Sequence, residues 1–181
     1  MKHFFKFTCA AAVLTAGIIT LSSFTKKEKT ATTLDAYSIQ LISNTPDESR
    51  GADMYTWTWA ISNPNPGNGE DGTLQDVSHI SIPLSTDAEA ALVSAEYSYD
   101  GITWFNNPLS VDRDPTIKTC TAADVLKFDV GTTGDEPLYI RITFSDDFES
   151  SAWAKCYIKT GGGRNGCNTY YFTGVANRKL D

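Results

Sequence analysis

The chain has 181 residues, four of them cysteine, and a formal net charge of −7. Once an N-terminal leader is set aside, the length predicts one domain with a sizeable core. The acidic balance argues against nucleic acid or an anionic membrane surface as the partner.

Residues 1–23 predict a secretory signal peptide. Two lysines precede an apolar run over residues 7–21, and small and hydroxyl residues follow it. This order is typical of the n-region and h-region of a signal. The alternative is an uncleaved membrane anchor, since the run is near the lower limit of about 17 residues for a span. Gly17 and several threonines interrupt the run. We therefore expect cleavage, with the mature N-terminus between about Ser22 and Ala31.

The rest of the chain predicts an exported acidic domain. The leader holds Lys2 and Lys6 and no acidic residue, so 13 basic and 22 acidic side chains remain and the net charge becomes −9. Residues 24–33 predict a short flexible tail, and residues 34–181 a single β-domain. No segment after the leader is long and apolar enough to span a membrane. We expect a protein that is secreted or held at the cell surface.

Alternation of apolar and polar residues predicts strands through most of this domain. The expected strands are AYSIQLIS (36–43), MYTWTWAI (54–61), VSHISIPL (77–84), LVSAEYSY (92–99), VLKFDV (125–130), LYIRITF (138–144), AWAKCYIK (152–159) and TYYFTGV (169–175). One short helix is expected near STDAEAAL, capped by Ser85 or Thr86. Eight or nine short strands without alternating helices predict an all-β antiparallel sandwich with Greek-key connections.

The stretch YSYDGITWFN, residues 97–106, is similar to the Asp-box of sialidase propellers. It occurs once, and because Asp100 and Gly101 are adjacent it is one residue shorter than that motif. The chain is also too short for several four-stranded propeller blades. Asp-Gly between alternating apolar residues instead predicts a hairpin with a two-residue turn.

Three cysteines after the leader predict one disulfide and one free thiol. Alternation places Cys156 on the apolar face of its strand, so we expect it to be the buried thiol. We predict a Cys120–Cys167 bond between turn-rich segments. The alternative is a Cys156–Cys167 bond across the TGGGRN turn. The absence of a C-x-x-C motif and the presence of one histidine after the leader argue against a structural zinc site.

Candidates for catalysis are few. His79 has no G-x-S-x-G or H-E-x-x-H motif beside it, so we expect a histidine hydrogen-bonded within the sheet. The loop carboxylates leave two alternatives open, a calcium site or the acid–base pair of a glycan hydrolase. These carboxylates are Asp112, Asp114, Asp135, Glu136, Asp146, Asp147 and Glu149. Because acids are common in turns, we predict no catalytic residue, no metal and no cofactor.

The predicted binding surface comes from the strands 138–144 and 152–159. Their core-facing positions are Leu138, Ile140, Ile142 and Phe144 on one strand and Ala152, Ala154, Cys156 and Ile158 on the other. The alternate positions direct Tyr139, Arg141, Trp153, Lys155 and Tyr157 outward. If the two strands pair through SDDFESS, these five side chains form one patch that binds an acidic glycan or an acidic peptide. The alternative is a solvated sheet face with cation–π contacts.

Three further tryptophans need an assignment. Trp57 and Trp59 share a face with other apolar residues, so we expect them in the core rather than on a sugar-binding surface. Trp104 follows the predicted turn, and either packing or exposure fits its position.

Several segments together resemble a group of secreted bacterial domains that have no assigned activity. The resemblance covers about Tyr55 to Gly174 and depends on YTWTWAISNPNPGNGEDGTLQDVSHISIPL, AEYSYDGITW, VLKFDVGTTG, PLYIRITF and IKTGGGRNGC. It implies a secreted β-fold and transfers no catalytic residue. We therefore expect a secreted or surface module that binds a ligand. The alternatives are an extracellular glycan hydrolase and a purely structural component of the surface or matrix.

Overall fold

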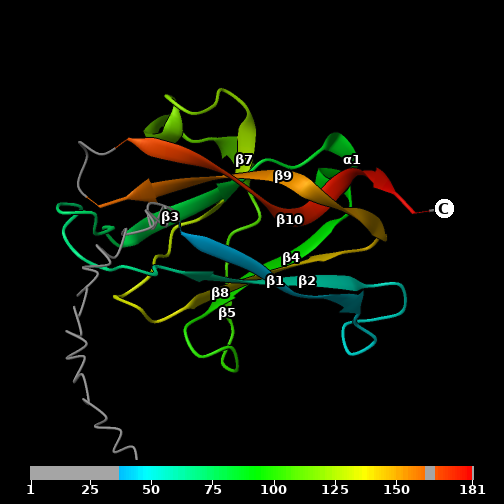
Figure 1. Ribbon diagram of the computed structural model, residues 1–181. Coiled ribbons are helices and arrows are strands. Elements are labelled where there is room, and N and C mark those ends of the chain that lie inside the picture. Colours follow the sequence, from blue (N-terminus) through cyan, green and yellow to red (C-terminus); the bar gives the residue numbers. More distant parts are fainter. Residues whose placement is uncertain (1–36, 162–165, 181) are drawn as a thin grey trace, which may run out of the picture. The chain divides into compact units, whose positions relative to one another are not determined.

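Two antiparallel sheets of five strands form the domain, as the computed structural model shows for residues 37–161 and 166–180. The sheets face each other in two layers (Figure 1). The prediction of an all-β antiparallel sandwich is therefore confirmed. The predicted signal peptide and tail lie outside the described residues.

The first sheet consists, in spatial order, of β1 (Ser38–Pro46), β2 (Tyr55–Ser62), β8 (Leu138–Phe144), β4 (Leu92–Ser98) and β5 (Phe105–Asn106). The second sheet consists of β10 (Cys167–Lys179), β9 (Phe148–Thr160), β3 (Val77–Ile82), β7 (Asp124–Phe128) and β6 (Val111–Arg113). A short helix, α1 (Thr86–Ala90), follows β3, and a 3-10 turn, η1 (Pro115–Ile117), follows β6.

The described residues form ten strands, more than the eight or nine expected. The additional strands are β5 and β6, of two and three residues, which are too short to show an alternating pattern. The helix lies where it was predicted. Ser85 caps it, because its hydroxyl accepts a hydrogen bond from the amide of Ala88 at 3.2 Å.

The Asp-Gly stretch does form a hairpin, but its turn is longer than two residues. Tyr97 of β4 pairs with Phe105 of β5, and the turn between the two strands runs from Tyr99 to Trp104. The carboxylate of Asp100 accepts hydrogen bonds from the amides of Ile102 at 2.8 Å and Thr103 at 2.7 Å. These backbone donors hold the pKa of the Asp100 carboxyl well below its usual range. The side chain therefore organises the longer turn in place of a tight Asp-Gly turn.

The core contains both tryptophans of β2, as predicted. Trp57 and Trp59 are buried and stacked, with ring centroids 5.9 Å apart. Trp59 also meets the ring of Phe172 on β10 edge-on at 5.7 Å. Its indole N–H donates a hydrogen bond to the carbonyl of Thr173 at 2.8 Å. One side chain of the first sheet thus fixes the edge strand of the second.

The strands β8 and β9 do not pair with each other, and this part of the sequence prediction is wrong. β8 pairs with β2 and β4, whereas β9 pairs with β3 and β10. The chain crosses from one sheet to the other between them, and Phe144 meets Phe148 edge-on across the core at 5.3 Å. Alternation is satisfied equally by a hairpin and by a crossing, because both place the same residues inward.

Trp59→Phe is expected to lower the free energy of unfolding by about 2 kcal/mol or more, because it removes ring volume and leaves the Thr173 carbonyl without its donor. Urea denaturation measures the change. The matched control is Trp153→Phe, an exposed position where we expect a change within about 0.5 kcal/mol. Equal stability of the two variants would contradict the role assigned to Trp59.

Candidate functional site

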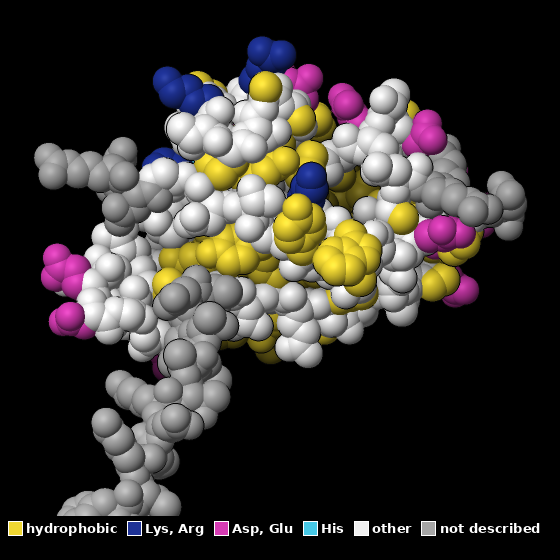
Figure 2. Space-filling view, turned by 45° about the horizontal axis from the view of Figure 1, so that its top comes forward, with side chains coloured by type: hydrophobic (Ala, Val, Ile, Leu, Met, Phe, Trp, Pro, Cys, Tyr) yellow, Lys and Arg dark blue, Asp and Glu magenta, His cyan; other side chains and the backbone are white. Residues whose placement is uncertain are grey.

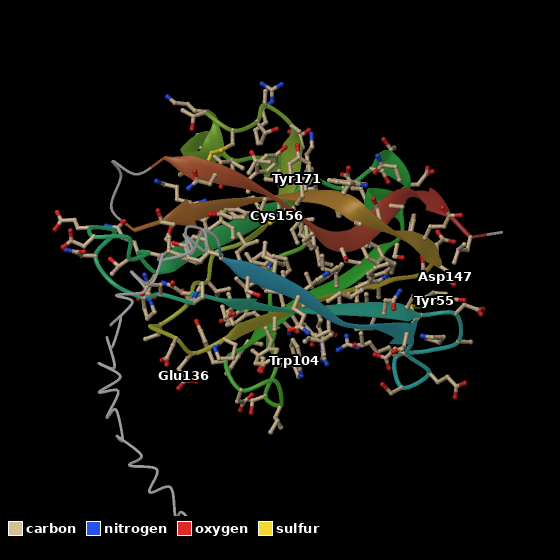
Figure 3. The ribbon with its side chains drawn as sticks, in the orientation of Figure 1. Tyr55, Trp104, Glu136, Asp147, Cys156 and Tyr171 are labelled. Atoms are coloured by element: carbon tan, nitrogen blue, oxygen red, sulfur yellow. A yellow bond between two sulfur atoms is a disulfide. The ribbon has the colours of Figure 1, made fainter. Side chains whose placement is uncertain are left out.

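The five residues predicted as one patch lie on two different sheets. Tyr139 and Arg141 belong to β8 of the first sheet, and Trp153, Lys155 and Tyr157 belong to β9 of the second. Figure 3 shows the separation: Trp104, over which Arg141 stacks, and Tyr171, which contacts Lys155, lie on opposite sides of the sandwich. The single patch is therefore wrong, for the same reason that the β8–β9 pairing is wrong.

Arg141 is already fully engaged within the protein. Its guanidinium binds both carboxylate oxygens of Glu96, at 2.8 and 3.0 Å, and lies 4.0 Å from the centroid of the Trp104 ring. Arg50 also binds this carboxylate, through its Oε2. Burial alone would raise the pKa of the Glu96 carboxyl, but hydrogen bonds and charge from Arg141 and Arg50 bring it below its ordinary value. This closed network leaves little of Arg141 for a ligand anion.

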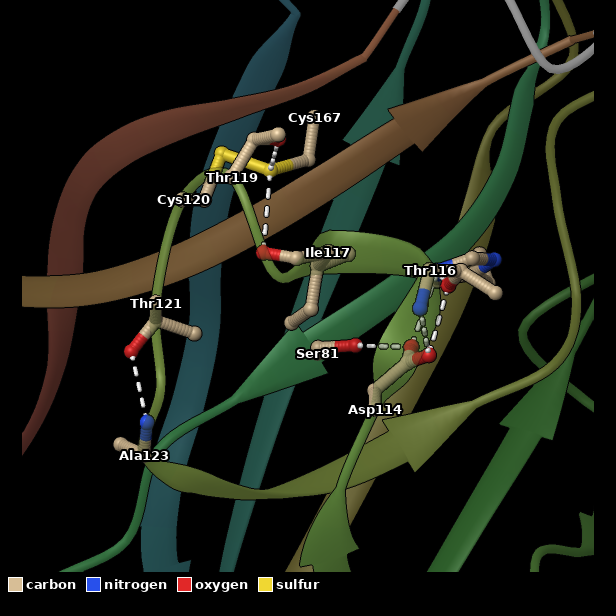
Figure 4. The surroundings of a disulfide bond; sticks show 10 residues. Ser81, Asp114, Thr116, Ile117, Thr119, Cys120, Thr121, Ala123 and Cys167 are labelled. Carbon is tan, nitrogen blue, oxygen red and sulfur yellow. Dashed lines mark hydrogen bonds and ion pairs between the residues drawn. A yellow bond between two sulfur atoms is a disulfide. The ribbon is translucent and has the colours of Figure 1, made fainter.

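Tyr157 is outward-facing on β9 but is not open to solvent. It is only 7% exposed and packs with Ile117 and Val125 in a small second cluster. The two disulfide cysteines lie against this cluster. Figure 4 shows the segment from Asp114 to Cys120 lying across the strands, with the disulfide at its far end. The expectation that Tyr157 is open to solvent is therefore wrong, because a loop that alternation does not reveal covers it.

The disulfide is Cys120–Cys167, as predicted, and it closes a sequence separation of 47 residues. Cys156 is the buried free thiol, also as predicted. Burial raises the pKa of this thiol to about 12, so at neutral pH the reactive thiolate is scarce. The bond joins the loop after η1 to the start of β10, and it holds that loop over Tyr157.

Replacing both Cys120 and Cys167 by alanine is expected to lower the free energy of unfolding by about 2–4 kcal/mol, because the unfolded chain loses a cross-link. Non-reducing peptide mapping of the parent protein should recover a peptide pair linked through these two residues. Iodoacetamide should modify Cys156 only after denaturation. Recovery of a peptide pair linked through Cys156 and Cys167 would contradict the assignment.

His79 lies in a buried polar cluster. Its Nε2 is 3.0 Å from the Thr116 hydroxyl and 3.2 Å from Asp114. The Thr116 hydroxyl donates its proton to Asp114 at 2.6 Å, so it accepts from the ring Nε2–H. The Nδ1 of His79 lies 4.0 Å from Asp129, and the carboxylate of Asp129 binds Lys127 at 2.8 Å. The prediction of a hydrogen-bonded histidine is confirmed, although the partner comes from η1 and not from the sheet.

His79 should make the domain less stable in mild acid. Burial first, and then the charge of Lys127, lower the pKa of its imidazole below the ordinary value. As the pH falls below about 6.5, the imidazole of His79 therefore takes up a proton in the unfolded chain before it does so in the folded protein. The stabilisation that is present above this pH is lost as the pH falls. We expect the free energy of unfolding to fall between pH 7 and 5.5 in the parent and to stay nearly constant in His79→Gln. Urea titrations at each pH measure the free energy of unfolding. An equal dependence on pH in the parent and in His79→Gln would contradict the assignment.

Trp153 and Tyr171 form the exposed aromatic pair of the domain's β9–β10 hairpin. Trp153 is 77% exposed and Tyr171 is 58% exposed, with ring centroids 6.2 Å apart and an interplanar angle of 74°. Lys155 pairs with Tyr171 across the two strands, and its ammonium lies 5.8 Å from the Tyr171 ring centroid. We call Trp153, Lys155 and Tyr171 the aromatic corner. Figure 2 shows hydrophobic side chains and a basic one standing together over these strands.

Tyr171 was missed in the sequence prediction, although a signal for it exists. Alternation in TYYFTGV places Tyr171 and Phe172 on opposite faces, and Phe172 is buried in the core. Pairing the last two predicted strands with each other, through the glycine-rich turn, would have placed Tyr171 beside Lys155.

A groove of about 380 Å³ adjoins the aromatic corner. Core side chains form part of its lining, and helix α1 and the strand ends supply the rest. The lining residues are Trp59, Ile82, Pro83, Leu84, Ser85, Ala88, Ile142, Ser151, Trp153, Ala154, Lys155, Phe172, Val175, Ala176 and Asn177. Lys155 is the one charged residue in this lining, as far as the chain is described. The site thus combines an apolar surface, a few polar groups and a single cation.

The loop carboxylates do not converge on this site. Figure 3 places Glu136 and Asp147 at opposite ends of the domain. Asp114 is bound to His79 and Thr116. Among residues 37–161 and 166–180, no group of three or more His, Cys, Asp or Glu side chains is arranged to hold a metal ion.

No protein-family model matches the chain, and searches of curated proteins and of solved structures find no match either. The resemblance to secreted bacterial domains therefore stays a prediction. Within the described residues, no helix has the length and apolar character needed to cross a membrane.

Proposed function

We propose that this protein is a non-catalytic binding module that acts outside the cytoplasm and binds carbohydrate at the aromatic corner. The observation that carries the proposal is the exposure of Trp153 and Tyr171 beside the groove. Burying a large apolar side chain is worth roughly 2 kcal/mol or more, so a sheet face that keeps two rings in water forgoes that stabilisation. Binding a ligand recovers part of it.

The chemistry of the corner favours a sugar. Aromatic faces stack on the C–H faces of sugar rings, and hydroxyl groups need hydrogen-bonding partners nearby. The groove supplies such partners through Ser85, Ser151 and Asn177. Its volume lies near the lower end of the range of about 300–1,000 Å³ for small-ligand sites. A short segment of a glycan fits these features better than a large folded partner does.

Binding without turnover is supported by the composition of the groove. Its described lining contains no carboxylate, so it lacks the pair of Asp or Glu side chains that most glycan hydrolases use. The hydrolase alternative would need its carboxylates elsewhere, and the loop acids are dispersed. Location outside the cytoplasm is supported by the disulfide, since such bonds persist in oxidising compartments.

Trp153→Ala and Tyr171→Ala should each weaken glycan binding about fivefold or more, roughly 1 kcal/mol, because each removes a stacking ring. A glycan array with the parent protein identifies the ligand, and calorimetry then compares the variants. The matched control is Tyr99→Ala. Tyr99 is 52% exposed and directly follows β4 of the first sheet.

Three outcomes would count against the proposal. The parent protein binds no glycan, or Trp153→Ala binds as tightly as Tyr99→Ala, or Trp153→Ala unfolds at a clearly lower temperature than the parent. The last outcome would assign Trp153 to the stability of the fold rather than to a ligand.

A further inference from the structure

We infer that the ligand is a single soluble glycan chain bearing acidic groups, with one acidic group beside Lys155 and the adjacent part of the chain in the groove. This inference rests on the proposed function, since it names the ligand class of the same site. Three features carry it: the angle between the two rings, the confinement of the groove, and the charge of its lining.

The angle between the rings excludes a flat ligand surface. The planes of Trp153 and Tyr171 are inclined at 74°, so one plane cannot contact both ring faces at once. A crystalline polysaccharide presents many chains in one plane and would be matched by coplanar rings. An inclined pair instead encloses one chain, with one ring against a sugar face and the other against its edge.

The groove extends the corner in one direction. Trp153 and Lys155 line both the corner and the groove, so a chain stacked on Trp153 reaches the groove without a break. The groove continues between the strand ends and α1, where Ser85 and Ala88 line it. Its volume of about 380 Å³ holds a short part of a chain, and the remainder stays in solvent.

Charge selects an acidic chain. Lys155 is exposed and forms no ion pair with any described residue, so its ammonium is available at the rim. The acids nearest to the groove along α1 are Asp87 and Glu89, which are exposed and outside the lining. Within the described lining of the groove, an anionic group is therefore attracted at Lys155 alone. The position of Lys155 therefore determines where on the protein the acidic group of the glycan binds.

Two matched glycan pairs test the inference by calorimetry on the purified protein. One pair is oligogalacturonate and its methyl ester, and the other is dextran sulfate and dextran. We expect at least one acidic member to bind about tenfold more tightly than its neutral counterpart, with an advantage that shrinks as salt rises. The pair that shows the preference identifies carboxylate or sulfate as the acidic group. Lys155→Gln should remove the preference for the acidic member.

Controls separate this inference from the proposed function. Lys155→Arg should retain the acidic preference, and Tyr99→Ala should match the parent throughout. Equal binding of acidic and neutral members in both pairs, or equal binding to crystalline cellulose, would overturn the inference and leave glycan binding intact. Binding of none of these glycans, together with a blank glycan array, would instead reject the proposed function. A preference that persists in Lys155→Gln would also overturn the role of Lys155.

Discussion

The hydrogen bond from the Trp59 indole to the Thr173 carbonyl is the contact on which the rest of the structure depends. A buried tryptophan needs a partner for its one polar group, and here that partner is the backbone of an edge strand. At this point β10 changes register against β9, between Phe172 and Gly174. Gly174 is required there, since a Cβ atom would lie 2.8 Å from the Cβ of Ala154. The contact thus fixes the irregular strand that carries Tyr171.

The same contact connects the core to the candidate site. Trp59 contributes to the groove lining, and the strands that it fixes present Trp153, Lys155 and Tyr171 to solvent. The two aromatic rings are therefore held on hydrogen-bonded strands rather than on a loop. Rigid placement of this kind lowers the entropic cost of ligand binding, because less of the protein has to be ordered.

Two other regions on the outer faces of the sandwich are closed by internal contacts. On the first sheet, Arg141 is held between Glu96 and Trp104. On the second, the segment after β6 covers Tyr157 and is fixed by the disulfide. The first region combines a cation and an aromatic ring, as the aromatic corner does, and the second contains an aromatic ring. What differs is the neighbouring loop, because no described loop covers Trp153 and Tyr171.

The sequence by itself determined the class of fold, the core and the pairing of the cysteines. Alternation identified the inward residues of β2 and β8 correctly, because the period of a strand fixes which side chains share a face. Cysteine parity and the turn-rich positions of Cys120 and Cys167 identified the bond. The cap of α1 followed from Ser85. All of these features depend on neighbours along the chain or on composition.

Only the tertiary structure decided which outward residues share a surface. Alternation does not say which strand lies beside which, so Arg141 and Trp153 were expected together although they belong to different sheets. It does not reveal loops that return over a face, so Tyr157 was expected in solvent. Tyr171 joins Lys155 because β10 pairs with β9. Apart from the β9–β10 hairpin, whose pairing the glycine-rich turn indicates, strand pairing and loop cover are long-range contacts, fixed by packing the whole chain, and no local pattern in the sequence encodes them.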